Sequence, residues 1–278
     1  MILLKKVNRI NKIIFFKFLI LIFLIILKPN FSFSEIVPCN EPKCDKKFDL
    51  TLTRFIEAKE KNDKPIIVWL SGGTGQFFST DPLSEVEGKY DIVVMFNPYN
   101  ISSGSQNRSD GYAPAAYKPD QADRIKSIIK FYSDKYKKPI WLGGQSFGAA
   151  RTMAYLAASS NNSKLISGIV LTGTAVGSVK KNTLKVPLKK IKDLNLPIGI
   201  FHHIKDVCDT SSYKTAQKLQ KKLKEINVGI TEFISIESGN LKKDTKCGFG
   251  GKYTRNHKFE DSRKELADTV IKFINQNS

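Results

Sequence analysis

Histidine and cysteine are scarce in this chain of 278 residues, which contains three histidines and four cysteines. The four cysteines, Cys39, Cys44, Cys208 and Cys247, do not have the spacing of a metal-binding motif. The three histidines are too few and too poorly placed to complete a zinc site. The sequence therefore predicts a protein without a bound metal.

Acidic residues are also under-represented, with 26 Asp and Glu against 45 Lys and Arg, so that the formal net charge is +19. Such an excess can favour an anionic surface or substrate. The lysines are scattered along the chain, however, and no basic patch interleaved with aromatic residues stands out. We therefore expect no nucleic-acid partner. Internal repeats and low-complexity linkers are absent as well, which favours one folded domain.

The chain has no apolar run long enough to cross a bilayer comfortably, since the longest is Phe18–Leu27. That run follows a basic stretch and precedes small residues at Ser32 and Ser34, a pattern typical of a secretory signal peptide. We predict that residues 1–34 are this signal peptide and that the mature chain begins at Glu35. The segment carries six basic residues and no acidic ones, so cleavage lowers the net charge from +19 to +13. The protein is then exported to the periplasm or the extracellular space, without stable membrane insertion after cleavage.

All four cysteines lie in the part of the chain that is predicted to be exported, where an oxidising compartment favours disulfides over free thiols. Four cysteines allow three pairings. We favour a local bridge between Cys39 and Cys44, because Pro42 favours a tight turn between them, together with a long-range bridge between Cys208 and Cys247.

Apolar runs of strand length alternate with amphipathic helical stretches beyond residue 65. This alternation predicts an α/β fold, a three-layer sandwich in which helices cover both faces of a mostly parallel sheet of about six strands. Residues 35–64 are polar and are expected to form an N-terminal arm with a short helix around Leu52–Lys59, leading into a domain over residues 65–278. The expected strands are 66–70, 91–96, 139–142, 168–172, 196–202 and 229–236, and Ser262 with Glu265 predicts a capping box at the start of the final helix.

The motif that organises the domain is Gly144-Gln145-Ser146-Phe147-Gly148, which lies between an apolar run and a stretch rich in small residues at helical spacing. A G-x-S-x-G sequence in this context is typical of a nucleophile elbow. The serine sits on a sharp turn, and glycines two residues before and after it let the strand and the helix approach each other. The motif predicts Ser146 as a nucleophile and the amide of Phe147 as an oxyanion donor. The alternative is a glycine-rich turn that carries a surface serine.

A nucleophilic serine needs a histidine base that is oriented by a carboxylate. His257 lies between the last predicted strand and the final helix, and two aspartates, Asp206 and Asp209, follow the strand before it. His202 and His203 are consecutive on a strand, so they point to opposite faces and at most one can face the site. We interpret this pair as structural. The order serine, aspartate, histidine is the one expected of the α/β-hydrolase fold.

On these motifs the chain resembles the α/β-hydrolase superfamily, in particular small secreted members with esterase-, lipase- or dienelactone-hydrolase-like cores. The resemblance covers about Pro65 to Ile274 and includes the glycine-rich loop Ser71–Gly75. It implies Ser146 as the nucleophile, Asp206 as the acid and His257 as the base. Asp209 is the alternative acid, and Asp206 is preferred because it lies closer to the end of the predicted strand 196–202.

The resemblance also implies that the second oxyanion donor comes from the loop after the first apolar strand, with Gly73 or Thr74 as candidates. A dinucleotide-binding turn is the rival interpretation of this loop. It fails because the third glycine is missing and no acidic residue closes a following strand, so no cofactor is expected. A Cys208–Cys247 bridge would join the loop of the acid to the loop that approaches His257.

The sequence as a whole predicts an exported serine hydrolase that cleaves a carboxylic ester through an acyl-enzyme intermediate. The insertion between the predicted strands 168–172 and 196–202 is too short for a large cap domain, which suits a small-molecule or polymer-attached ester. A peptidase, a thioesterase or an acyltransferase would use the same triad. A secreted binding protein without catalytic activity, built on the same fold, is the alternative from another class. The sequence leaves the acyl and alcohol groups and the oligomeric state open.

Overall fold

The computed structural model of the chain describes residues 32–44, 50–72, 80–95, 119–175, 185–191, 193–208, 211–239 and 255–278. All of them belong to one unit, Ser32–Ser278. The elements in chain order are β1 (Ser32–Pro38), β2 (Leu50–Ile56), β3 (Ile66–Leu70), η2 (Leu83–Val86), β4 (Ile92–Met95), α4 (Pro119–Tyr136), β5 (Ile140–Gln145), α5 (Phe147–Ala158), η3 (Ser160–Leu165), β6 (Gly168–Thr172), α6 (Lys185–Lys190), β7 (Ile198–His203), α7 (Tyr213–Ile226), β8 (Thr231–Ile236) and α8 (Arg263–Asn277).

The strands form one sheet in the order β1-β2-β4-β3-β5-β6-β7-β8. Every neighbouring pair from β4 through β8 is parallel, whereas β2 runs antiparallel to β4 and β1 antiparallel to β2. Strands β3 to β7 are buried along their whole length, which explains why their sequences are mostly apolar. The predicted α/β class with a mostly parallel sheet is confirmed.

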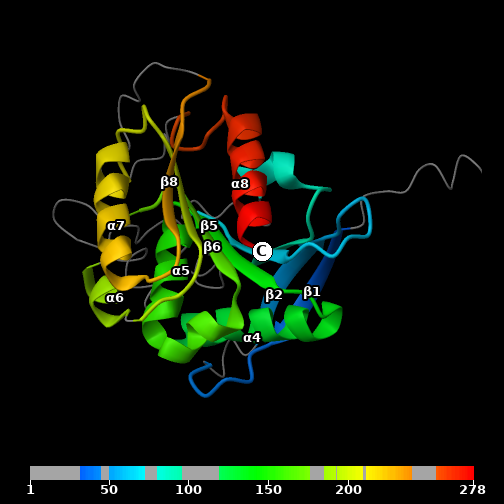
Figure 1. Cartoon of the computed structure of the whole chain (residues 1–278). Helices are drawn as coiled ribbons and strands as arrows, with labels where there is room; N and C mark the ends of the chain where they lie inside the picture. The colour runs from blue at the N-terminus through cyan, green and yellow to red at the C-terminus, as the bar shows by residue number, and fades with distance from the viewer. Residues whose placement is uncertain are drawn as a thin grey trace, which may run out of the picture. The chain divides into compact units, whose positions relative to one another are not determined.

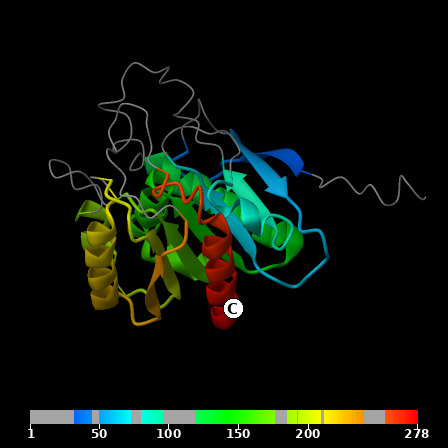
Figure 2. The ribbon, with the colours of Figure 1, turned by 90° about the horizontal axis from the view of Figure 1, so that it is seen from above.

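Helices cover both faces of the sheet (Figure 1). One apolar cluster joins the sheet to α4, α5 and α7, and a second joins the opposite face to α8 and η2. The view from above shows α7 and α8 on different sides of the sheet (Figure 2). The three predicted layers are therefore present. Within the described part of the stretch between β6 and β7 there is only the short helix α6, so this part contains no large cap domain. No helix in the described ranges is long and apolar enough to span a membrane.

The described residues form a sheet of eight strands, not about six, because β1 and β2 occupy a stretch that was expected to be an arm. The helix predicted around residues 52–59 is wrong, since β2 covers most of it. Thr51, Thr53 and Phe55 alternate inward, and the Thr53 hydroxyl lies 2.7 Å from the Tyr132 hydroxyl on α4. Two of the three inward residues are threonines, which hid the apolar alternation. Strand β1 also includes the last three residues of the predicted signal peptide.

Helix α8 begins where the sequence predicts, but it does so without the predicted capping box. The side chain of Ser262 makes no capping hydrogen bond. The Glu265 carboxylate instead accepts hydrogen bonds from the backbone N–H groups of Glu237 and Ser238, which follow β8. A carboxylate in the first turn of a helix is stabilised by the positive end of the helix dipole. Here the carboxylate also connects α8 to the end of β8.

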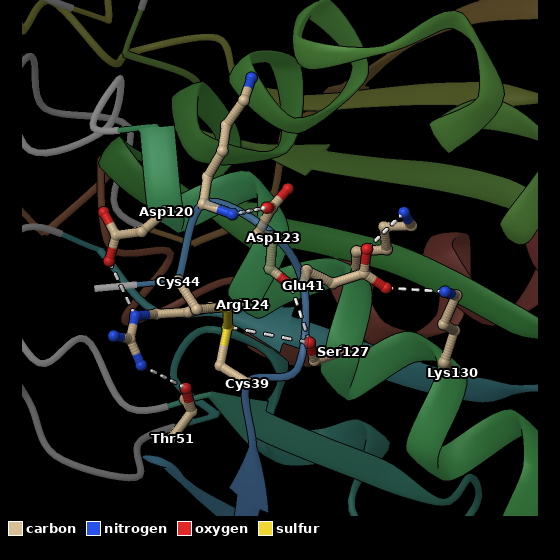
Figure 3. Close-up of a disulfide and its surroundings, with 11 residues drawn as sticks. Cys39, Glu41, Cys44, Thr51, Asp120, Asp123, Arg124, Ser127 and Lys130 are labelled. Carbon is tan, nitrogen blue, oxygen red and sulfur yellow. Dashed lines mark hydrogen bonds and ion pairs between the residues drawn. A yellow bond between two sulfur atoms is a disulfide. The ribbon is translucent and has the colours of Figure 1, made fainter. Parts of the chain in front are cut away.

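The predicted Cys39–Cys44 disulfide is present and closes a short loop after β1, residues 39–44, which we call the N-terminal clasp (Figure 3). The Ser127 hydroxyl on α4 points at the Cys39 sulfur at 3.8 Å. The clasp is attached to α4 by three further contacts: Lys43 N to Asp123 Oδ2 at 2.8 Å, Lys126 Nζ to Glu41 Oε2 at 2.6 Å and Lys130 Nζ to Glu41 Oε1 at 2.7 Å.

Candidate active site

Ser146 lies on the turn between β5 and α5 with φ +54° and ψ −110°. A positive φ is uncommon for any residue except glycine, and such a conformation costs on the order of 1–3 kcal/mol. The turn is held from β6, because the Ser146 N–H donates to Thr172 O at 2.9 Å and the Ala175 N–H donates to Ser146 O at 3.1 Å. This is the strained strand-to-helix turn that the G-x-S-x-G motif predicted.

The two glycines of the motif are required by close backbone contacts. A Cβ on Gly144 would lie 2.4 Å from the carbonyl carbon of Gly148, and a Cβ on Gly148 would lie 1.8 Å from the carbonyl oxygen of Leu70 in β3. Real Cβ atoms do not come so close to backbone, so any other residue would push α5 away from the sheet. Phe147 is the first residue of α5, and N–H groups of a first helical turn point out of the helix end.

Asp206 and His257 are in direct contact although they are 51 residues apart, since Asp206 Oδ2 lies 2.8 Å from His257 Nδ1. Both side chains are almost fully buried, each residue being 1% exposed. Asp206 follows β7, where its Oδ1 accepts a hydrogen bond from the Cys208 N–H at 2.9 Å. Because His257 Nδ1 must donate to the carboxylate, the lone pair of the neutral ring is on Nε2.

The Asp206 carboxyl group stays ionised in this buried position. Burial by itself raises its pKa, but the charge and hydrogen bond of His257, and those of His202, outweigh the burial and hold the pKa well below its usual range. The His202 Nε2 atom lies 3.1 Å from the same Oδ2 that faces His257. A carboxylate that is ionised and oriented is the partner that a catalytic histidine requires.

His257 also lies against the residue that precedes the elbow serine. The Gln145 side-chain amide donates to the His257 carbonyl at 3.3 Å, and Gln145 Nε2 is 3.5 Å from His257 Nε2. Gly173, which follows β6, has φ +48°, and a Cβ there would lie 3.2 Å from His257 O and 3.3 Å from the ring carbon Cε1. The end of β5, the end of β6 and the turn before α8 thus meet at one edge of the sheet, the edge formed by the carboxyl ends of the strands.

The structure brings together Asp206 and His257 directly, and it places Ser146 at the same edge of the sheet. The other predicted site residues lie outside the described residues: Gly73, Thr74, Asp209 and Cys247. Cys208 is 2% exposed and disulfide-bonded, and the bridge to Cys247 stays a prediction.

Three further residues contact the site, although no motif of the sequence assigned them to it. Gln145 is an unspecified position of the G-x-S-x-G motif, and its side chain reaches His257. The Ser211 hydroxyl lies 3.0 Å from His257 Nδ1, just before the helix α7, which Ser212 caps. His202 was interpreted as structural, and the strand alternation alone could not tell whether it or His203 faces the site.

Asp206, Cys208 and His257 also have potential metal-binding atoms within 4.8 Å of one another. A zinc site of this kind would use a cysteine thiolate, but Cys208 is disulfide-bonded. The two remaining groups bind each other at 2.8 Å. The donor set therefore does not fit a metal ion, and the chemistry that it supports is proton transfer.

No family model and no curated protein matches the sequence of this chain. Solved structures do match its fold. A prolyl endopeptidase has a TM-score of 0.58 at 11% identity over 89% of this chain, which spans only 38% of that enzyme. Est1E from Butyrivibrio proteoclasticus has a TM-score of 0.56 at 11% identity, covering 88% of this chain and 98% of its own. An α/β serine hydrolase homologue from Coxiella burnetii has a TM-score of 0.53 at 12% identity, covering 88% and 98%.

These likenesses, at identities too low to carry function, define the architecture. The chain has the α/β-hydrolase fold, as the resemblance of its motifs implied.

Proposed function

We propose that this protein is an exported serine hydrolase that cleaves a carboxylic ester with Ser146, His257 and Asp206 as its triad. The observation that carries the proposal is the 2.8 Å contact between the buried Asp206 carboxylate and His257, at the edge of the sheet where Ser146 lies on a strained elbow and where Gln145, the preceding residue, contacts His257. Buried ionisable groups are costly unless they are paired. A pair of this kind beside such a serine is typical of acyl-transfer chemistry.

In the proposed reaction the Ser146 hydroxyl attacks the ester carbonyl while His257 Nε2 takes its proton. The Asp206 carboxylate holds the imidazole in place and stabilises the imidazolium without taking the proton. The Phe147 N–H, with a donor from the loop after β3, stabilises the oxyanion of the tetrahedral intermediate. Collapse of the intermediate breaks the bond to the alcohol, which leaves with the proton from His257. Water then attacks the acyl-enzyme by the same steps and releases the acid.

Two observations bear on the substrate and the compartment. The short α6 between β6 and β7 favours an open site, which suits a small-molecule ester or an ester attached to a polymer. The match to Est1E covers 98% of that chain, so this chain corresponds to nearly the whole of Est1E. The Cys39–Cys44 disulfide and the signal-peptide pattern both favour an oxidising compartment outside the cytoplasm.

A peptidase is the second candidate, because a prolyl endopeptidase shares the fold. That enzyme is far longer than this chain, so the ester substrate is preferred here. A binding protein without catalytic activity would have no use for an ionised carboxylate buried against a histidine, which argues against that alternative.

The first experiment is labelling of the purified protein with a fluorophosphonate probe, followed by mass spectrometry of the modified peptide. We expect the label on Ser146, and we expect it to disappear in both Ser146→Ala and His257→Ala. His203→Gln is the matched control and should label normally, because the described hydrogen bonds of the His203 ring go to the backbone of Lys205 and Ser238 and not to a triad side chain. A folded wild-type protein that takes no label would reject the triad and favour the binding protein.

A further inference from the structure

A second histidine reaches the carboxylate of the proposed triad. His202, in β7, is completely buried, and its Nε2 atom lies 3.1 Å from Asp206 Oδ2. The same oxygen lies 2.8 Å from His257 Nδ1. One carboxylate oxygen thus faces two imidazole rings, while the other oxygen accepts the Cys208 N–H.

His202 has few other ways to satisfy its ring nitrogens. Neither nitrogen has a well-aligned hydrogen-bond partner among the described residues. The ring centroid lies 6.2 Å from that of Tyr213, an edge-on contact that offers no hydrogen bond. Leaving a buried polar group unsatisfied is destabilising, and the 3.1 Å contact with Asp206 is the interaction that can offset this cost. Catalytic hydrogen bonds are often poorly aligned before substrate binds and tighten afterwards.

We propose that His202 is a positioning residue, whose Nε2–H donates to Asp206 Oδ2 and holds this carboxylate in the orientation that His257 needs. The inference rests on the proposed triad. Three donors then fix the carboxylate: the imidazoles of His202 and His257 and the backbone N–H of Cys208.

The donor on His202 has a second effect, on charge. When His257 takes the proton of the serine, Asp206 must remain ionised beside the imidazolium. A hydrogen bond to the charged form of a carboxylate favours that form. It also disperses the negative charge that His257 experiences, so that His257 releases its proton to the leaving alcohol more easily. The titratable side chains that face His202 in the described ranges are Asp206 and Tyr213, with His257 across the shared oxygen.

The neighbouring histidine provides a natural control. His203 is also buried, at 1% exposure, but it points to the other face of β7. Its Nδ1 accepts the Lys205 N–H at 3.1 Å, so its Nε2 carries the proton and donates to Ser238 O at 3.0 Å. The hydrogen bonds of its imidazole go to the backbone of Lys205 and Ser238, not to the side chain of Asp206 or His257. Its backbone carbonyl accepts the Asp206 N–H at 3.0 Å, a contact that does not involve the His203 side chain.

The test compares His202→Leu, His202→Gln and the control His203→Gln in fluorophosphonate labelling and in hydrolysis of an activated aryl ester across pH. His202→Leu should lower kcat and the labelling rate about 10- to 100-fold, as expected for loss of one hydrogen bond to a charged group, with KM within about twofold. The rising limb of its pH–rate profile should move to higher pH. His202→Gln, whose amide can donate to Asp206, should recover most of the rate. His203→Gln should keep the wild-type rate and profile.

A second readout does not depend on activity. The chain contains only three histidines, so ¹⁵N-histidine NMR of the wild-type protein can resolve each ring. We expect His202 with the proton on Nε2 and none on Nδ1. The His257 signals should shift in His202→Gln and stay unchanged in His203→Gln. This measurement also decides the question if His202→Leu does not fold.

The outcomes separate the two proposals. If wild-type protein is folded and takes no label, the proposed function fails. If wild-type protein labels on Ser146 and folded His202→Leu labels at the same rate with the same pH profile, the role of His202 is overturned. Equal losses in His202→Leu and His203→Gln would overturn it as well, because they would show a purely structural effect. An Nε2 atom of His202 that carries no proton would also contradict the inference.

Discussion

The candidate active site and the N-terminal clasp both pair charges across long sequence separations, but they do so in opposite environments. At the site, the side chains of Asp206, His257 and His202 are at most 2% exposed. In the clasp, Glu41 meets Lys126 and Lys130, whose side chains are 28% and 48% exposed. Removing one partner of a buried pair leaves an uncompensated charge, whereas an exposed pair contributes about 0–1 kcal/mol.

Contacts of similar length in these two regions therefore have different consequences for the protein. The 2.8 Å contact at the site fixes the proton of the buried imidazole on Nδ1 and so orients the ring for its proposed role as a base. The contacts of 2.6 and 2.7 Å in the clasp hold residues 39–44 against α4. Substitutions at the site should therefore change activity first, and substitutions in the clasp should change stability alone. Four predictions test this division.

The largest effect is expected for Asp206→Asn. The amide can present its NH₂ group to His257 Nδ1, which favours the wrong tautomer, and kcat/KM should fall about 10³- to 10⁴-fold. Steady-state hydrolysis of an aryl ester measures this loss, and the thermal unfolding curve reports whether the fold is kept. Asp134→Asn is the control, because that side chain is 81% exposed on α4. A loss below about tenfold would remove Asp206 from the triad and direct attention to Asp209.

The next effect is expected for Gly173→Ala. Gly173 has φ +48° and packs against His257, so a methyl group there would strain the backbone and displace the ring. We expect about 1 kcal/mol of lost stability and a fall of at least about tenfold in kcat. Gly88→Ala is the matched control, since Gly88 also has a positive φ, +79°, but a Cβ there would meet the flexible side chain of Lys59 and not a residue of the site. If both variants lost activity equally, the contact with His257 would not be the cause.

In the clasp, the double variant Cys39→Ala, Cys44→Ala should lower the free energy of unfolding by about 2 kcal/mol, the value that chain entropy gives for so short a loop. Urea denaturation measures the change. The rate of aryl-ester hydrolysis should stay unchanged at a temperature where both proteins are folded, because the clasp packs on α4 and not on the site. A loss of activity without a loss of stability would contradict the division between the two regions.

The smallest effect is expected for Glu41→Gln, about 1 kcal/mol or less. Burial raises the pKa of Glu41, but hydrogen bonds and charges of Lys126 and Lys130 outweigh it and leave the pKa lowered. A lowered pKa stabilises the fold above the pKa of the unfolded carboxyl group, and this contribution is lost as the pH falls through the folded value. The difference in unfolding free energy between wild-type protein and Glu41→Gln should therefore be present at pH 7 and decrease steadily as the pH is lowered into the acidic range where the carboxyl group of the folded protein becomes protonated. Molar salt should also reduce it. A difference in unfolding free energy that does not decrease on acidification would require another cause.

Several features of the fold could be predicted because they depend on local patterns. The mostly apolar sequences of β3 to β7 reflect burial of these strands on both faces of the sheet, and this burial could be predicted from the sequence. The elbow could be recognised because glycine alone fits at Gly144 and Gly148, and this backbone constraint is written in the sequence. With three histidines in the chain, His257 was the one histidine placed in the order that the fold demands.

Other features could not be predicted, because they depend on contacts between distant segments. Strand β2 was hidden by Thr51 and Thr53, which are buried polar residues whose inward direction is stabilised by side chains of α4. The Glu265 carboxylate had the spacing of a capping box, but two backbone N–H groups at the end of β8 compete for it.

The amino-acid sequence by itself determined the alternation of strands and helices, the elbow at Ser146 and the local Cys39–Cys44 loop, since each depends on neighbouring residues and on backbone geometry. Only the tertiary structure decided which histidine of the pair in β7 meets Asp206. A strand directs consecutive side chains to opposite faces, but which face holds the site depends on how β7 packs between α7 and α8.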